Sequence, residues 1–157
     1  MATVVPGRMT AEIDGDFVVF MIGMRVNRWW KIHKWWPVAM SMPRMVRELR
    51  ANPALGCLHA DLRQGISIQY WRSFDRLEQY AHARDHEHLP AWAAFNRKVR
   101  TSSGDIGIWH ETFLVRAGEY ETVYGSMPRA GLALAGRHVP VAKDRDNARQ
   151  RLRSDRG

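Results

Sequence analysis

The sequence has a single cysteine, Cys57, and lacks any long run of apolar residues. One thiol cannot form an internal disulfide, which excludes a disulfide-stapled fold. The longest apolar run, Phe17 to Met24, falls far short of the roughly 20 residues that a membrane-spanning helix needs. The N-terminus also shows no pattern of a secretory signal. These absences predict a cytoplasmic protein without a transmembrane segment.

Acidic residues are scarce relative to basic ones, with 16 Asp and Glu against 24 Lys and Arg, and the net charge is +8. Residues 143–157 alone contribute six basic and three acidic side chains. No helix-turn-helix pattern, zinc-finger spacing or RNA-binding aromatic signature accompanies this charge, so no nucleic-acid partner is expected. The tail is expected to be disordered or a fraying helix, because it has almost no apolar residues.

The composition, with 45% hydrophobic and 25% charged residues, is that of one ordinary globular domain. We expect an N-terminal extension over 1–14, the domain over 15–141, and a basic tail over 142–157. The predicted elements are strand 17–26, helix 38–49 with a kink at Pro43, strands 55–62 and 66–71, helices 76–83 and from Leu89, and strand 106–115. A short strand over 119–124 and an extended arm over 131–141 follow.

The order of these elements, β-α-β-β-α-β, predicts an α+β, ferredoxin-like sandwich with a four-stranded antiparallel sheet. Helices cover one face of such a sheet. The strands 17–26 and 106–115 are apolar on both faces, so the second face also needs cover. A second copy of the chain is the expected cover, which predicts a homodimer with the 131–141 arm lying on the neighbouring subunit.

Four sequence blocks resemble a monooxygenase-like family across about residues 15–141. The blocks run from Asn27 to Trp35, from His88 to Asn96, from Gly107 to Phe113 and from Tyr124 to Pro128. The resemblance implies a dimeric α+β barrel with a ligand pocket between sheet and helices. In one departure, Ser126 stands where the family pattern has asparagine, which shortens the reach of any hydrogen bond to a ligand.

The relatives of that superfamily imply two chemistries. Cofactor-independent oxygenases act on phenolic or enolisable substrates, whereas haem proteins include aldoxime dehydratases and peroxidase-like enzymes. We expect a monooxygenase-like oxidoreductase that acts on a small apolar or aromatic substrate without a required cofactor. Haem binding, with His88 or His110 as axial ligand and Arg72 or Arg97 at the propionates, is the alternative. A non-catalytic small-molecule-binding module is the third reading.

Alternation along the last strand assigns His110 to one face and Glu111 to the other, unless a bulge at Gly107 changes this. His110 is the leading catalytic base because imidazole accepts a proton near neutral pH. A buried histidine bonded to a backbone carbonyl is the structural alternative. Glu111 either forms an ion pair with Arg25 or Arg72, or orients a catalytic partner. His88 is the second catalytic candidate.

Aromatic residues are expected to line the substrate pocket or to fill the core. The candidate pocket residues are Trp92, Phe95, Trp109, Phe113, Tyr70, Trp71 and Trp36. A separate histidine group, His82, His86 and His88, lacks a completing ligand and is expected to be a solvated turn without metal.

The segment Trp29–Trp36 interleaves four tryptophans with two lysines and one histidine. Three readings compete: a lid over an apolar pocket, a dimer contact, and a weak peripheral membrane contact with tryptophans at headgroup level. The lid and the dimer contact are the preferred ones.

Overall fold

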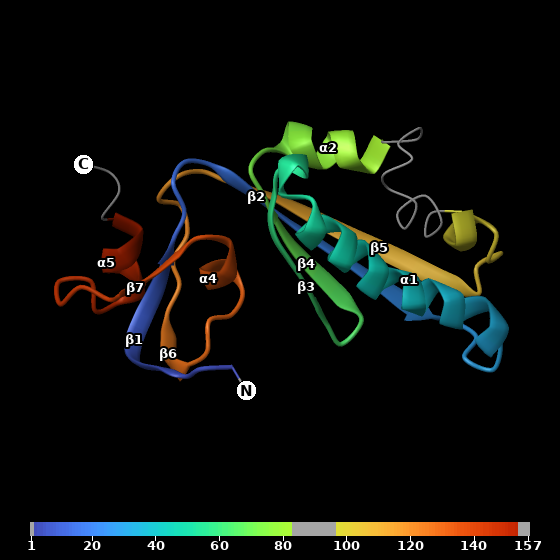
Figure 1. Cartoon of the computed structure of the whole chain (residues 1–157), viewed down its shortest axis with the longest axis horizontal. Helices are drawn as coiled ribbons and strands as arrows, with labels where there is room; N and C mark the ends of the chain where they lie inside the picture. Colours follow the sequence, from blue (N-terminus) through green and yellow to red (C-terminus); the bar gives the residue numbers. More distant parts are fainter. Residues whose placement is uncertain (1, 83–96, 154–157) are drawn as a thin grey trace.

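The computed structural model describes residues 2–82 and 97–153. The described chain forms two antiparallel sheets, one with the strand order β3-β4-β2-β5 and a smaller one with the order β6-β1-β7. The protein is therefore a mixed α+β protein. Figure 1 shows the small sheet at one end and helix α1 lying along the four-stranded sheet at the other.

The four-stranded sheet follows the predicted chain order closely. Its elements are β2 (Phe17–Val26), α1 (Ile32–Ala51), the short 3₁₀ helix η1 (Pro53–Leu55), β3 (Cys57–Arg63), β4 (Ile66–Trp71), α2 (Phe74–His82) and β5 (Ile106–Val115). Residues 97–100 are also helical. The hairpin between β3 and β4 turns at Gln64 and Gly65, both with positive φ, as two-residue hairpin loops require.

Helix α1 is longer than the sequence predicted, because it begins at Ile32 and passes through both Pro37 and Pro43. A proline in a helix interior costs about 3 kcal/mol. An apolar stripe offsets this cost: Val38, Met42, Met45, Val46 and Leu49 are buried at helical spacing. The helix therefore continues through Pro43 without a break, since burial of this stripe against the sheet outweighs the local preference.

The main core lies between the sheet and the helices α1 and α2. Trp71 is fully buried there and its ring packs against Tyr80, with 5.3 Å between ring centroids. Its indole N–H donates to the Oε1 atom of Gln69 at 3.0 Å, and Gln69 in turn donates to Ser67. A buried ladder of satisfied polar groups thus stiffens β4 under the helices. Ser73 caps α2 by accepting the backbone N–H of Arg76.

The smaller sheet contains segments that the sequence pattern placed incorrectly. Its elements are β1 (Val5–Glu12), β6 (Tyr124–Met127), α4 (Leu132–Ala135) and β7 (Arg137–Pro140), and helix α5 (Ala148–Arg153) follows. The expected strand over 119–124 is wrong, because β6 begins where that segment ends. The expected arm over 131–141 folds back instead as α4 and β7, and β7 pairs with β1 of the same chain.

The described part of the tail, which ends at residue 153, contains the short helix α5. Arg151 donates to the carboxylate of Glu121 at 2.8 Å, and Arg8 forms an ion pair with Asp146. These pairs fix α5 against the small sheet. The fraying-helix alternative is closer to the observed structure, because α5 is a short helix, but ion pairs with distant residues hold it in place.

Gly136, between α4 and β7, is a sensitive position of the small sheet. A Cβ atom there would overlap the backbone oxygen of Glu12 and approach the side chain of Ile13 to 2.7 Å. Gly136→Ala is expected to lower the free energy of unfolding by about 1–3 kcal/mol, the usual cost of overpacking. Gly125→Ala in β6 is the matched control, since its Cβ would meet nothing within 4 Å. Equal free energies of unfolding for the two variants in chemical denaturation would contradict this packing.

Candidate functional site

A pocket of about 370 Å³ lies between the sheet and helix α2. Strands β2 and β5 supply its floor and α2 supplies one wall. The described residues that line it are Phe20, Ile22, Phe74, Leu77, Glu78, Tyr80, Ala81, His82, Val99, Ile108, His110 and Thr112. Most of this wall is apolar, and the polar groups gather at the β5 and α2 sides, which is the usual character of a small-molecule site.

The alternation of β5 decides which of its residues reach this pocket. Ile108, His110 and Thr112 line it, whereas Glu111 does not. The register between β5 and β2 is continuous from Phe17↔Val115 to Val26↔Ile106, so no bulge rotates the strand. The sequence prediction that His110 and Glu111 point to opposite faces is confirmed.

His110 is an exposed side chain at the edge of the sheet, because β5 pairs only with β2 among the described strands. Its ring lies against Phe20, with 5.7 Å between centroids and a 37° tilt. The alternative of a buried structural histidine is therefore wrong. An imidazole that meets an apolar floor on one side and open space on the other can contact a bound molecule and exchange protons with it.

Helix α2 brings two further polar residues to the pocket, Glu78 and His82. They lie four residues apart, so they share one face of the helix. The sequence pattern predicts a solvated turn at His82 and gives no role to Glu78. Their i, i+4 spacing beside the apolar residues Leu77 and Ala81 is the signal that would have found them.

Several predicted pocket residues lie elsewhere. Trp71 belongs to the core, and Tyr70 packs beneath α4 on the opposite face of the sheet. Trp109 and Phe113 also project from that opposite face, and Trp36 is exposed on α1. The remaining predicted residues, His88, Trp92 and Phe95, lie outside the described residues, as does His86.

The expected ion pair of Glu111 is absent from the described part of the chain. Glu111 is exposed, and Arg72 instead donates to the backbone oxygen of Asp14 at 2.7 Å. The prediction assumed that β5 is covered on both faces. In a single chain the Glu111 face of this edge strand is open to solvent, so the carboxylate needs no partner.

The described lining of this pocket offers few groups that could hold a haem. Its described lining contains no arginine or lysine that could pair with propionates, and Arg72 is engaged at Asp14. Within residues 2–82 and 97–153 no three side chains of His, Cys, Asp or Glu form a metal cluster. Cys57 is buried, and burial raises the pKa of its thiol to about 12, which leaves it a poor nucleophile.

The tryptophan segment is anchored at one end of the sheet by a buried carboxylate. Asp105 is 2% exposed and pairs with Arg28, Lys31 and Lys34, whose nearest nitrogen lies 2.6 Å away. Trp29 and Trp30 nevertheless remain largely exposed, as does Trp36. None of the segment's four tryptophans contributes to the described wall of the pocket, which does not support the lid reading.

No helix in the described residues is long and apolar enough to cross a membrane.

Comparison with known proteins places this pocket in a family context. Residues 17–132 match the model of the monooxygenase af470-like family, a span that runs from β2 to the start of α4 and holds every described residue of the pocket. The chain belongs to the monooxygenase af470-like family. The resemblance seen in the sequence blocks is thereby confirmed.

The monooxygenase af470-like family includes a curated relative from Aspergillus fumigatus, named monooxygenase af470. The two proteins are 30% identical over 156 aligned positions. The alignment covers 79% of this chain and 52% of the relative, so the chain spans about half the length of that protein. No solved structure matches the chain.

Ser126, the departure from the family pattern, lies in β6 of the small sheet and is exposed. It is not part of the described pocket wall. The comparison of reach between serine and asparagine at a ligand therefore does not apply to this pocket.

Proposed function

We propose that the protein is a monooxygenase that oxidises a small apolar or aromatic molecule in the pocket between β5 and α2, with His110 as the catalytic base. The observation that carries this proposal is the position of His110, the strand residue that faces the apolar pocket within the family-matched region. The family name supports oxidation as the reaction class, and the lining of the pocket supports an apolar substrate.

The proposed reaction needs no resident cofactor. The imidazole of His110 removes a proton from an activated CH₂ group of the substrate, and the carbanion passes one electron to dioxygen. The resulting substrate radical and superoxide form a C–O bond, and the proton returns to give a hydroperoxide. The O–O bond then breaks as the second C–H proton leaves, so that CH₂ and O₂ become C=O and H₂O. Apolar walls such as Phe20 and Ile22 keep water from the radical pair.

Glu78 and His82 are proposed to position the substrate and to exchange the proton with solvent. They reach the pocket from α2, opposite the strand that carries His110. A carboxylate that is four residues from an imidazole on one helix face can hold that imidazole in one orientation. In this arrangement α2 supplies the groups that exchange the proton with solvent, and β5 supplies the base.

The proposal is tested with freshly purified protein. Dioxygen uptake is measured with a panel of enolisable aromatic ketones and phenols, and bound small molecules are extracted and identified. Substrate-dependent uptake with equimolar formation of the oxidised product is expected from colourless protein. A sharp Soret band would contradict the cofactor-free reaction, and an extracted ligand that is never turned over would favour a binding module.

We also propose that the four-stranded sheet is a ferredoxin-like sheet that closes into a dimeric α+β barrel with a second copy. The strand order β3-β4-β2-β5, with α1 and α2 in the two crossovers, is that expected for a split βαβ arrangement. Helix α4 covers the far face near Phe17, Val19 and Tyr70. Trp109 and Phe113 are exposed on the part of that face that the described chain leaves open, and Glu111 lies between them on β5.

Two neighbouring residues of β5 lie on opposite faces of the sheet, and substituting each of them in turn tests the proposed dimer interface. Phe113 is 49% exposed on the far face, whereas Leu114 is 71% exposed on the helix face. Phe113→Asp is expected to convert a dimer to a monomer in analytical ultracentrifugation, because a charge would be buried between the sheets. Leu114→Asp should remain dimeric. A monomeric wild type, or a dimer that tolerates Phe113→Asp, would exclude this interface.

A further inference from the structure

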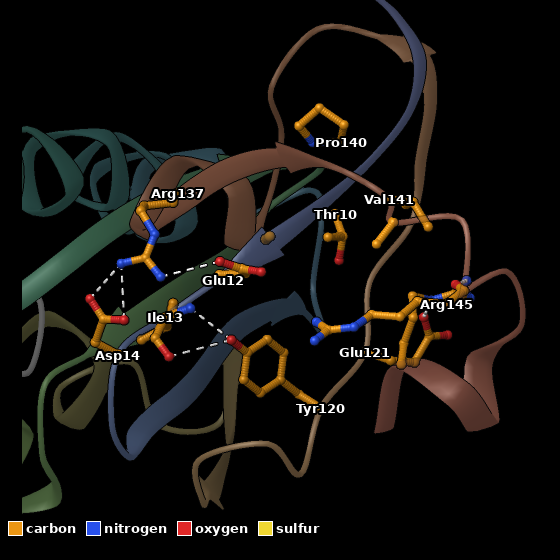
Figure 2. Close-up of a pocket in the computed structure, with 13 residues that line it drawn as sticks. Thr10, Glu12, Ile13, Asp14, Tyr120, Glu121, Arg137, Pro140, Val141 and Arg145 are labelled. Atoms are coloured by element: carbon orange, nitrogen blue, oxygen red, sulfur yellow. Dashed lines mark hydrogen bonds and ion pairs between the residues drawn. The ribbon is translucent and has the colours of Figure 1, made fainter. Parts of the chain in front are cut away.

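A second pocket, of about 250 Å³, lies on the small sheet, away from the proposed active site. Figure 2 shows Glu12, Asp14 and Arg137 on one side of Tyr120, and Glu121 and Arg145 on the other. The described residues that line it are Thr10, Ala11, Glu12, Ile13, Asp14, Tyr120, Glu121, Arg137, Pro140, Val141, Ala142, Arg145 and Arg151.

Each carboxylate that lines this pocket is paired with an arginine, whereas Arg145 is paired with none of them. Arg137 pairs with Asp14 at 2.7 Å and with Glu12 at 3.2 Å, and Arg151 pairs with Glu121 at 2.8 Å. Three arginines thus face three carboxylates, but Arg137 takes two of them. Within the described residues Arg145 forms no ion pair, so its guanidinium is the cation of this pocket without a carboxylate of its own.

The walls of the pocket are fixed by hydrogen bonds. The Tyr120 hydroxyl accepts the backbone N–H of Ile13 at 2.7 Å (Figure 2). The hydroxyls of Thr10 and Thr122 share a hydrogen bond of 3.0 Å. Arg151 donates to the backbone oxygen of Arg145 at 3.1 Å, which holds the turn that carries Arg145. A site with preset walls loses little conformational entropy when a ligand binds.

The apolar part of the wall limits the kind of ligand. Ala11, Ile13, Pro140 and Val141 line the pocket between the charged groups. A planar guanidinium matches a carboxylate through two parallel hydrogen bonds. A second negative charge on the ligand would meet Glu12, Asp14 and Glu121 without a further cation to balance it.

From this arrangement we infer that the small-sheet pocket binds a short aliphatic monocarboxylate, with Arg145 as the partner of the carboxylate. The site is separate from the proposed reaction, because it shares no lining residue with the pocket between β5 and α2. Tyr120 and Glu121 lie within the family-matched span of residues 17–132, whereas Thr10–Asp14 and residues 137–151 lie outside it.

Butyrate is the probe for this site. Titration of butyrate into the full-length, ¹⁵N-labelled protein is expected to shift the backbone amides of Val141 and Arg145 in a saturable way. Arg145→Gln is expected to weaken binding by at least about tenfold, because it removes a charge-assisted hydrogen-bond partner. Arg149→Gln, a charge-matched change in α5 outside the pocket lining, should bind as the wild type does.

Three further outcomes decide the inference. Butyramide, which has the same shape without the charge, should not bind, and inorganic phosphate should bind more weakly than butyrate. Arg145→Lys keeps the positive charge and should retain part of the affinity for butyrate. Comparison with Arg145→Gln then shows whether the loss of affinity in that variant is due to the lost charge. No saturable shift with butyrate, equal loss in Arg149→Gln, or tighter binding of phosphate would overturn the inference.

Discussion

Replacing His110 with alanine is expected to lower turnover by about 10²–10⁴-fold, the usual contribution of a general base. The fold should persist, because the side chain is exposed and its ring contacts only Phe20 among the aromatic residues described. Dioxygen uptake at saturating substrate measures the effect. Loss of kcat with a smaller change in KM is expected, since proton abstraction occurs in the transition state and contributes less to ground-state binding.

Glu111→Ala is the matched control for the His110 variant. Glu111 is the next residue of the same strand. Its side chain is also exposed, and it projects from the opposite face. It should keep kcat near that of the wild type. If Glu111→Ala loses as much activity as His110→Ala, or if His110→Ala remains fully active, the assignment of the base to the α2-facing side is wrong.

Replacing Asp105 with asparagine is expected to destabilise the protein and release the tryptophan segment. The substitution would leave Arg28, Lys31 and Lys34 without the carboxylate that they share. The backbone oxygen of Asp105, which accepts the N–H groups of Asn27 and Arg28, is unchanged, so the side-chain effect is isolated. A lower melting temperature and faster tryptophan anisotropy decay are expected. Asp144→Asn, an exposed position in the C-terminal turn, is the control.

The carboxylate of Asp105 also makes the stability of the folded protein depend on pH in the acid range. Hydrogen bonds from Lys34, opposed by burial and reinforced by Lys31, lower the pKa of Asp105 to about 2 from an ordinary value of 3.8. A carboxylate with a lowered folded-state pKa stabilises the fold above its unfolded pKa and loses that contribution as the pH falls. Stability should therefore decline between about pH 4 and pH 2. Asp105→Asn should show a smaller decline; an identical acid profile in both proteins would contradict this.

Sequence periodicity predicted the four-stranded sheet because those strands are long, apolar and separated by strong turn residues. The hairpin at Gln64 and Gly65 and the helix cap at Ser73 depend on local chemistry, which the sequence carries directly. Helix α1 passed through Pro37 and Pro43 because its buried stripe is a tertiary contact, and local propensity does not include such contacts.

The sequence pattern does not predict the small sheet, and the reason is different. Strands β6 and β7 are short, and β1, although longer, pairs with segments more than a hundred residues away, such as Tyr124. Short strands without an apolar repeat give a weak pattern. Ion pairs such as Arg151 with Glu121 hold α5 in place, and pairs between distant charged residues leave no trace in hydropathy.

The candidate site was predicted in part. Alternation assigned His110 to one face of β5 correctly, but it could not tell which face meets α2. Trp109 and Phe113 are predicted to line the pocket because they are aromatic, but they lie on the same face of β5 as Glu111. Gly23, opposite Trp109, leaves space for its ring, since a Cβ atom there would lie 2.6 Å from the indole.

An anaerobic titration shows on which face of the four-stranded sheet the substrate binds. With a turned-over substrate added in the absence of dioxygen, NMR signals of the His110 ring and the Thr112 methyl group are expected to shift together and saturate. The indole N–H signal of Trp109, on the far face of the same strand, should stay in place. Saturable shifts at Trp109 with an unchanged His110 ring would place the substrate on the other face of the sheet and contradict the account.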